Sequence, residues 1–389
     1  MDVISFIVSI LLACCCVLWL ILLFRLLKMA MTRANIREGL DLPSPDNEKV
    51  SIVVPAHNEE RCIDDCIRGL RQQTHRDIEI IMVLDRCTDG TTEIAHRHAS
   101  EDDRVVVIEN ESCPDDWAGK CNAARVGASR ATGDWLLFSD ADTTFDPRLV
   151  RASVASATKR DASLLSILST LTTGRFFERT VQPMASTFLV RIFPIDRVNR
   201  EHRPRPFANG QFLLFRRDAY ESIGGHEAVK DDLLEDIAFA KKMHLGGGRV
   251  QLLLADGMLT CSMYDSFGKF CEGWRRIFVE AGGRNPSILR HNAWLSATVG
   301  VAAPLMGYLG VVLGATVLPD LLVLGIAAVA LQLIVTGWLY RINGAPLLWA
   351  FLAPIGAAVV ARLFLDAASM VENRTPIRWG GREYILEPR

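Results

Sequence analysis

The chain has 389 residues, enough for roughly two or three domains, and its 43 basic side chains nearly balance its 45 acidic ones. The net charge of −2 excludes a generally basic nucleic-acid binder and an acidic tail protein, so we expect no nucleic-acid partner. Half of the residues are hydrophobic, and charges are almost absent from Val3–Phe24, Trp294–Tyr340 and Ile342–Ala361. We therefore expect a membrane protein with a water-facing body.

The first apolar stretch predicts a membrane anchor over residues 1–28. A spanning helix needs about 20 apolar residues, and Val3–Phe24 meets that length. The start Met1-Asp2 lacks the basic residues of a secretory signal, and no small-residue cleavage site follows, so we expect the anchor to be retained. By the positive-inside rule, the basic residues after it favour a multi-pass protein of the cell (inner) membrane with a cytoplasmic body. These residues are Arg25, Lys28, Arg33 and Arg37.

Residues 49–290 are expected to form a domain of alternating strands and helices. Helices are expected over 62–70, 91–98 and 122–130, and strands at Val50–Val54, Ile78–Leu84, Arg104–Ile108 and Trp135–Ser139. This alternation predicts an α/β fold with a Rossmann-like, mostly parallel sheet, whose ligands bind at the carboxyl ends of the strands.

Two other segments of the body, Phe176–Arg200 and the helix that carries Cys62 and Cys66, are expected to be structural. Phe176–Arg200 mixes apolar residues with arginines, and we expect one helix there, lying either on the membrane surface or in the core. Cys62 and Cys66 are four residues apart on a helix, where core packing is a better interpretation than a metal site.

A C-terminal membrane region is expected over residues 293–368, with two to three segments, followed by a basic tail over 369–389. The candidate segments are Leu295–Leu318, Leu321–Tyr340 and Pro346–Leu365. Three full spans would put the tail outside, whereas its four arginines favour the inside. Either the rule fails or one segment does not cross fully, and Leu295–Leu318 is the candidate because Pro304 and three glycines weaken a straight helix.

Acidic and amide side chains follow the predicted strands. Asp140-Ala141-Asp142 closes the fourth strand, and two carboxylates at that spacing can bind one Mg²⁺ or Mn²⁺ ion together with phosphates. By itself this pattern is weak, but other chemistry-bearing residues lie at neighbouring strand ends. These are Asn58, Glu59, Asp85 and Lys120.

These segments resemble the family 2 glycosyltransferases of GT-A fold. The resemblance covers roughly Val50–Asn285 and rests on three ordered motifs, which are Val53–Glu60, Leu84–Thr91 and Asp140–Asp142. Trp117–Lys120 and the closing Arg378–Tyr384 resemble the membrane-bound branch that includes hopene-associated and carotenoid glycosyltransferases. The resemblance implies a nucleotide-sugar donor, with a UDP-sugar expected, a divalent metal, and transfer with inversion.

The resemblance also implies roles for individual residues. Pro55, Asn58, Glu59 and Asp85 would hold the nucleotide. Asp140 would contact the ribose or diphosphate side and share the metal with Asp142. Lys120 would meet the diphosphate as a point charge. Asn209-Gly210-Gln211 is expected to border the acceptor site.

Inversion requires a base on the acceptor side of the sugar. Glu235-Asp236 matches the family's acidic pair, in which the Asp deprotonates the acceptor, although Leu234 replaces the usual Thr. The alternative is ordinary acidity at a helix N-terminus. Processive synthases carry the motif Gln-x-x-Arg-Trp. This chain instead has Cys-Glu-Gly-Trp-Arg-Arg over residues 271–276, so polymer synthesis is disfavoured. Trp274 and Arg275 either close over the acceptor or diphosphate, or anchor the chain at the membrane surface.

We therefore expect a membrane-bound glycosyltransferase acting on a lipid acceptor in the bilayer, such as a hopanoid, carotenoid or glycolipid. The enzymatic alternative is a polyprenyl-phosphate or polysaccharide glycosyltransferase. The alternative outside enzymes is a transporter or scaffold with an inert GT-A domain. Transporters usually show hydrophobic repeats, which this sequence lacks. The tail segment Arg378–Arg382 is expected to be cytoplasmic and close to the catalytic site.

Overall fold

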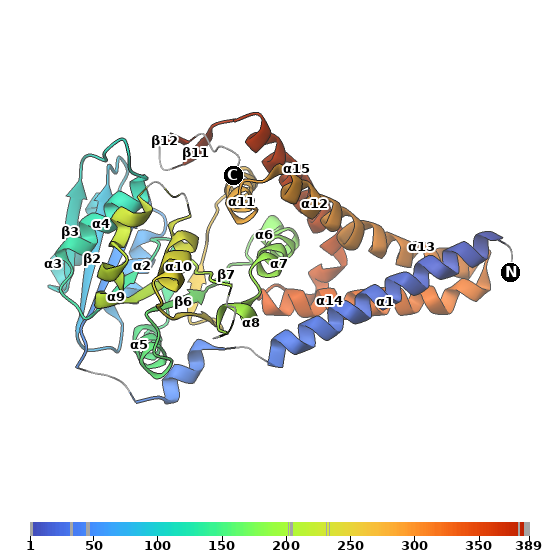
Figure 1. Cartoon of the computed structure of the whole chain (residues 1–389), viewed down its shortest axis with the longest axis horizontal. Coiled ribbons are helices and arrows are strands. Elements are labelled where there is room, and N and C mark those ends of the chain that lie inside the picture. Colours follow the sequence, from blue (N-terminus) through green and yellow to red (C-terminus); the bar gives the residue numbers. More distant parts are fainter. Residues whose placement is uncertain are drawn as a thin grey trace. The chain divides into compact units, whose positions relative to one another are not determined.

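The structure is a computed structural model that describes residues 3–31, 34–43, 47–200, 202, 205–230, 232, 234–379 and 382–384. The chain forms two compact units. The sheet unit comprises Arg33–Leu171 and Phe193–Met263, and the helical unit comprises Met1–Thr32, Thr172–Ile192 and Tyr264–Arg389. Each unit is described by itself, with the elements labelled as in Figure 1.

A seven-stranded sheet forms the centre of the sheet unit, in the order β3-β2-β1-β4-β8-β6-β9. All neighbours are parallel except at β8, which is antiparallel to both β4 and β6. The predicted mostly parallel sheet is therefore confirmed. The strands are β1 (Val50–Ala56), β2 (Ile78–Asp85), β3 (Val105–Asn110), β4 (Trp135–Phe138), β6 (Leu164–Leu168), β8 (Leu213–Arg216) and β9 (Val250–Leu254).

Helices cover this sheet, and three short strands form a second one (Figure 1). The four strands and three helices expected up to residue 139 are confirmed, with ends shifted by at most three residues. The second sheet contains β5 (Thr143–Phe145), β7 (Thr170–Leu171) and β10 (Leu259–Cys261). The helices are η1 (Ile36–Asp41), α2 (Ile63–Arg71), α3 (Thr91–Glu101), α4 (Gly119–Arg130), α5 (Leu149–Lys159), α8 (Ile195–Val198), α9 (Arg217–Ser222), η2 (Gly225–Val229) and α10 (Glu235–Leu245).

The core of the sheet unit is built from the β-branched strands and the apolar faces of the helices. Ile52 and Val54 on β1 and Met82 on β2 are fully buried, so their removal from water drives the sheet and helices together. Cys66 on α2 is fully buried in the same cluster, which confirms its predicted packing role.

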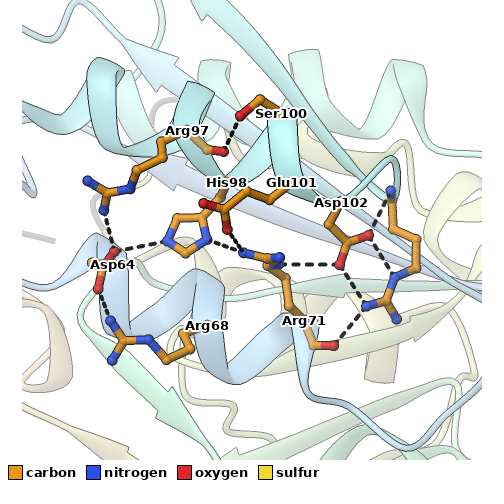
Figure 2. Close-up of polar contacts among 9 residues, drawn as sticks. Asp64, Arg68, Arg71, Arg97, His98, Ser100, Glu101 and Asp102 are labelled. Carbon is orange, nitrogen blue, oxygen red and sulfur yellow. Dashed lines mark hydrogen bonds and ion pairs between the residues drawn. The ribbon is translucent and has the colours of Figure 1, made fainter.

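A polar network joins α2 to α3 (Figure 2). His98 lies between the two helices, where its Nε2 is 3.0 Å from Asp64 and its Nδ1 is 2.7 Å from an Arg71 nitrogen. Arg71 also donates to Glu101 at 2.8 Å, and Arg97 donates to Asp64 at 2.7 Å. Exposed ion pairs stabilise little individually. Together, these contacts fix α2, which follows β1, against α3, which follows β2.

The helical unit holds four helices long and apolar enough to cross a membrane, among the residues that the structure describes. They span Val3–Ala30, Pro286–Thr316, Pro319–Ile342 and Leu347–Glu372. The elements are α1 (Val3–Met31), α6 (Phe176–Thr180), α7 (Gln182–Ile192), α11 (Phe267–Ala281), α12 (Pro286–Ala297), η3 (Thr298–Ala302), α13 (Ala303–Thr316), η4 (Pro319–Leu321), α14 (Leu322–Ile342), η5 (Leu347–Leu352), α15 (Ala353–Glu372), β11 (Ile377–Trp379) and β12 (Arg382–Tyr384).

Small residues let α13 and α14 approach closely. A Cβ added at Gly325 would lie 2.6 Å from the backbone carbon of Gly310, so the two backbones are in contact, as in many membrane helix pairs. The segment expected to be weak contains a π-helical turn, η3, directly before Pro304. Such a turn accommodates a proline inside a long helix. Incomplete crossing of this segment stays a prediction.

The expected single helix over Phe176–Arg200 is wrong. The structure has three helices there, α6, α7 and α8. Pro183 lies in the first turn of α7 and Pro194 is the N-cap of α8. A proline has no N–H to donate to the preceding turn and clashes with it, so a continuous helix ends before each one.

The tail forms an antiparallel pair of strands, β11 and β12. Gly380, Gly381 and residues 385–389 lie outside the described residues. The expected cytoplasmic position of the tail, close to the catalytic site, stays a prediction.

Candidate functional site

The predicted polar residues gather at the carboxyl ends of β1, β2 and β4. Asp85 is the last residue of β2. Asp140 lies just after β4, separated from its last residue, Phe138, by Ser139. Pro55 lies near the end of β1, beyond Val53, where the pairing of β1 with β4 stops. Because β1, β2 and β4 are parallel neighbours, these ends meet at one edge of the sheet.

Asp85 is a buried carboxylate held by Asn110 and Arg86, with the Arg86 Nε 3.2 Å from each of its oxygens. Its Oδ1 accepts from Asn110 at 2.8 Å, and its Oδ2 accepts from Arg86 at 2.6 Å. Nearby, Asn58 adopts φ +58° and accepts from the Thr88 backbone at 2.8 Å, which fixes the loop after β1 against the loop after β2. The sequence analysis assigned no role to Asn110 or Arg86, although Asn110 is the last residue of the adjacent strand β3.

Asp142 belongs to a cluster of three carboxylates. Burial, and then the negative charges of Asp140 and Glu59, raise the pKa of Asp142 to about 7. Its buried Oδ1 accepts no hydrogen bond from any residue that the structure describes. An unpartnered buried carboxylate oxygen beside other carboxylates suits a hard cation, so the donor set fits Mg²⁺ or Mn²⁺.

Thiols surround the acidic cluster. Cys62 donates to Glu59 Oε2 at 3.2 Å, and Gln211 donates to Cys261 Sγ at 3.0 Å. Burial, and then the neighbouring Glu59, raise the pKa of the Cys62 thiol well above its ordinary value. Across the described part of the chain, no three His, Cys, Asp or Glu side chains form a complete metal site. Any cation here would therefore need oxygen ligands from its substrate.

Lys120 connects the acidic cluster to the predicted base. Its Nζ lies 2.6 Å from Asp140 Oδ1 and 2.6 Å from Glu235 Oε1. Burial alone would lower the pKa of Lys120, but the two carboxylates raise it well above its ordinary value. The residue therefore remains a cation. A Cβ added at its neighbour Gly119 would lie 3.3 Å from Asp85 Oδ2, so the start of α4 also adjoins Asp85.

Asp236 is held by a backbone amide. The Gly210 N–H donates to Asp236 Oδ2 at 2.7 Å. Burial and the charge of Glu235 raise the pKa of Asp236 to about 7, whereas Lys120 outweighs burial and lowers the pKa of Glu235. A Cβ at Gly210 would lie 3.2 Å from both Asp236 Oδ2 and Lys120 Nζ, so only glycine leaves this space open. Asp236 thus has the properties of a base that works near neutral pH.

Nine predicted site residues lie in the sheet unit, whereas Trp274 and Arg275 lie on α11 of the helical unit. Trp274 is buried there between Phe270 and Phe278, and its role in donor binding stays a prediction. The nine residues are Pro55, Asn58, Glu59, Asp85, Lys120, Asp140, Asp142, Glu235 and Asp236. The sequence did not predict that Cys261 lies beside Asp142. Cys261 is on β10, which approaches Asp142 through the pairing of β10 with β5 in the second sheet, and no local pattern predicts that pairing.

The chain is similar in sequence to known glycosyltransferases. The sequence model described as "Glycosyl transferase family 2" matches residues 51–224. A curated relative, 4,4'-diaponeurosporenoate glycosyltransferase of Staphylococcus aureus, is 24% identical over 254 residues, covering 63% of this chain. This chain spans 64% of the length of that relative.

Solved structures with similarity to the chain include two complexes with nucleotide sugars. A mannosyltransferase from Pyrobaculum calidifontis, solved with GDP-Man and Mn²⁺, covers 93% of this chain and 98% of its own, at 17% identity and a TM-score of 0.46. TarS residues 1–349 of S. aureus, solved with UDP-GlcNAc, covers 87% and 96%, at 15% identity and a TM-score of 0.43.

Proposed function

We propose that the chain, whose residues 51–224 match the family 2 glycosyltransferases, transfers a sugar, with inversion, from a nucleotide-sugar donor to a lipid acceptor. The donor is a UDP-sugar and the acceptor is a bilayer lipid of the hopanoid, carotenoid or glycolipid kind. The protein lies in the cell membrane with the sheet unit in the cytoplasm. The observation that carries the proposal is Lys120, whose single Nζ pairs with Asp140 after β4 and with Glu235 beside Asp236.

Donor binding is assigned to the strand ends. The carboxylate oxygens of Asp85 can accept a hydrogen bond from an N–H of the nucleobase. Asn58 and Pro55 shape the loop beside Asp85. Asp140 and Asp142 would hold Mg²⁺ or Mn²⁺, which when bound neutralises charge on the diphosphate leaving group. Lys120 stabilises the same developing charge as a preorganised cation that needs no reorganisation during the reaction.

Acceptor activation is assigned to Asp236. The acceptor oxygen forms a bond to the anomeric carbon as the bond to the diphosphate breaks, and the acceptor proton passes to Asp236. Glu235 stays ionised because Lys120 lowers its pKa, and its negative charge raises the pKa of Asp236. Two adjacent carboxyls with separated pKa values are the usual arrangement for one structural and one catalytic role.

The test is acceptor-dependent release of UDP by the purified full chain in nonionic detergent. UDP-hexoses are supplied with Mn²⁺ and a fractionated membrane lipid extract, and the glycolipid product is identified by mass spectrometry. Release should require both the lipid and the metal. Asp218→Asn is a matched control, since this exposed Asp on α9 is outside the site. A folded protein that binds no nucleoside diphosphate would support the inert-domain alternative.

A further inference from the structure

A pocket of about 450 Å³ lies between α11 and α15, within the helical unit. From α11 it is lined by Phe267, Cys271 and Arg275, which are four residues apart and so share one face of the helix. From α15 it is lined by a second face that includes Arg362 and Asp366. Apart from Arg275, for which closing over the acceptor or diphosphate stays a prediction, the residues of this pocket have no role in the proposed reaction.

The pocket carries a net positive charge. Arg362 pairs with Asp366 at 2.8 Å along the same helix. Arg275 donates to the backbone carbonyl of Cys271 at 3.2 Å and, among the described residues, has no carboxylate partner. The pocket lining therefore holds two guanidinium groups but a single carboxylate. Because guanidinium groups bind phosphate and carboxylate in a planar, paired geometry, the excess charge favours an anionic group.

The remaining walls are apolar and belong to a helix that can cross a membrane. Ala358, Val359 and Leu363 come from α15, which lies within the candidate span Leu347–Glu372. Ionisable residues inside such helices are costly in lipid and commonly mark a functional site. Phe267, which is 47% exposed, extends the apolar wall on the α11 side.

We propose that this pocket binds a bilayer amphiphile with an anionic phosphate headgroup. Arg275 and Arg362 hold the headgroup, and its hydrocarbon chain lies along Ala358, Val359 and Leu363. The inference rests on the membrane location in the proposed function but not on sugar transfer, so the two can fail separately. Basic pockets between membrane helices are a known means of binding anionic lipid headgroups.

Cys271 in the pocket wall provides the measurement. The full chain in nonionic detergent is alkylated briefly with N-ethylmaleimide, and modification of Cys271 is read by peptide mass spectrometry, with Cys113 of the sheet unit as internal reference. Dioleoyl phosphatidic acid should slow the alkylation of Cys271 about tenfold and leave Cys113 unchanged. Equal protection by dioleoyl phosphatidylcholine, or protection by inorganic phosphate alone, would overturn the proposal.

Variants separate headgroup binding from misfolding. The double variant Arg275→Gln/Arg362→Gln should lose the protection, whereas Arg290→Gln should keep it, because Arg290 pairs with Glu372 away from the pocket. Asp366→Asn removes the competing carboxylate and should lower the phosphatidic acid concentration needed, a gain that a misfolded protein cannot give. Protection retained in the double variant, or no gain in Asp366→Asn, contradicts the proposal.

UDP binding in the same preparation reports separately on the proposed function. Protection of Cys271 without UDP binding would support the pocket while removing support for the transferase. UDP binding without protection by phosphatidic acid would overturn the pocket alone.

Discussion

Lys120 Nζ lies 2.6 Å from Glu235 Oε1, although the two residues come from different helices, α4 and α10. The same nitrogen lies 2.6 Å from Asp140 Oδ1. One buried cation therefore holds the acidic strand end and the acidic helix start together. Replacing either neighbour leaves a buried charge without its full set of partners, which makes this ion triad the most sensitive point of the site.

The first prediction concerns Lys120 itself. Lys120→Gln should lower kcat/KM by about 10²–10³, because the leaving group loses a preorganised cation. Lys120→Arg keeps the charge and should lose less. The kinetics are measured on the full chain with saturating Mn²⁺, and Lys241→Gln on the exposed face of α10 serves as the matched control. If Lys120→Gln turned over normally with an unchanged melting temperature, Lys120 would have no catalytic part.

The second prediction separates Asp142 from Asp236. Asp142→Asn should abolish metal-dependent UDP binding, because a carboxylate that faces the cation acts in binding as well as in turnover. Asp236→Asn should bind UDP normally but lose about 10²–10⁴ in rate, since a base acts only as the acceptor proton leaves. Calorimetry with UDP and Mn²⁺ distinguishes the two. Loss of UDP affinity in a folded Asp236→Asn protein would rule out its assignment as the base.

The sequence predicted the first half of the sheet unit well because its signals are local. Apolar runs followed by Asp85, or by Asp140 and Asp142, mark both the strands and the acidic residues at their ends. The break in the expected helix over Phe176–Arg200 also has a local signal, Pro183 and Pro194, although the mixture of apolar residues and arginines favours one amphipathic helix.

Other parts of the site depend on tertiary contacts that no short pattern contains. The Gly210 amide reaches Asp236 only because β8 inserts antiparallel between β4 and β6, bringing the loop before β8 to the start of α10. Likewise, the pKa values of Asp142 and Asp236 follow from burial and neighbouring charges, which exist only in the folded chain. The sequence identified these carboxylates, and the fold determines their protonation.

The third prediction is a pH dependence of turnover. Asp236 must be deprotonated to accept the acceptor proton, and its pKa is raised to about 7. Below that pH, kcat should fall about tenfold per unit as the base becomes protonated. Saturating Mn²⁺ is used because protons compete with the metal ion for Asp142 at low pH. Asp218→Asn should show the same profile, whereas a limb near pH 4 would mean that an ordinary, solvent-exposed carboxyl controls the rate.

The last prediction concerns His226, which is buried beside the site and does not take part in the chemistry. Its Nδ1 lies 2.7 Å from the Tyr220 hydroxyl, and the ring packs against Phe138 and Phe239. Burial lowers the pKa of His226 to about 3, so the folded protein excludes a proton that the unfolded chain binds below about pH 6.5.

Stability from this residue is therefore complete above pH 6.5 and is lost as the pH falls toward 3. Between pH 6.5 and 5 the loss should reach about 2 kcal/mol, at about 1.4 kcal/mol per unit. His226→Gln should have a lower melting temperature at pH 7.5 but a shallower decline with acid than the unaltered protein. His96→Gln is the matched control, because His96 is exposed on α3 and bonds only to Glu109 among the described residues. If the melting temperature of His226→Gln fell with acid as steeply as that of the unaltered protein, His226 would not be the residue whose protonation opposes folding.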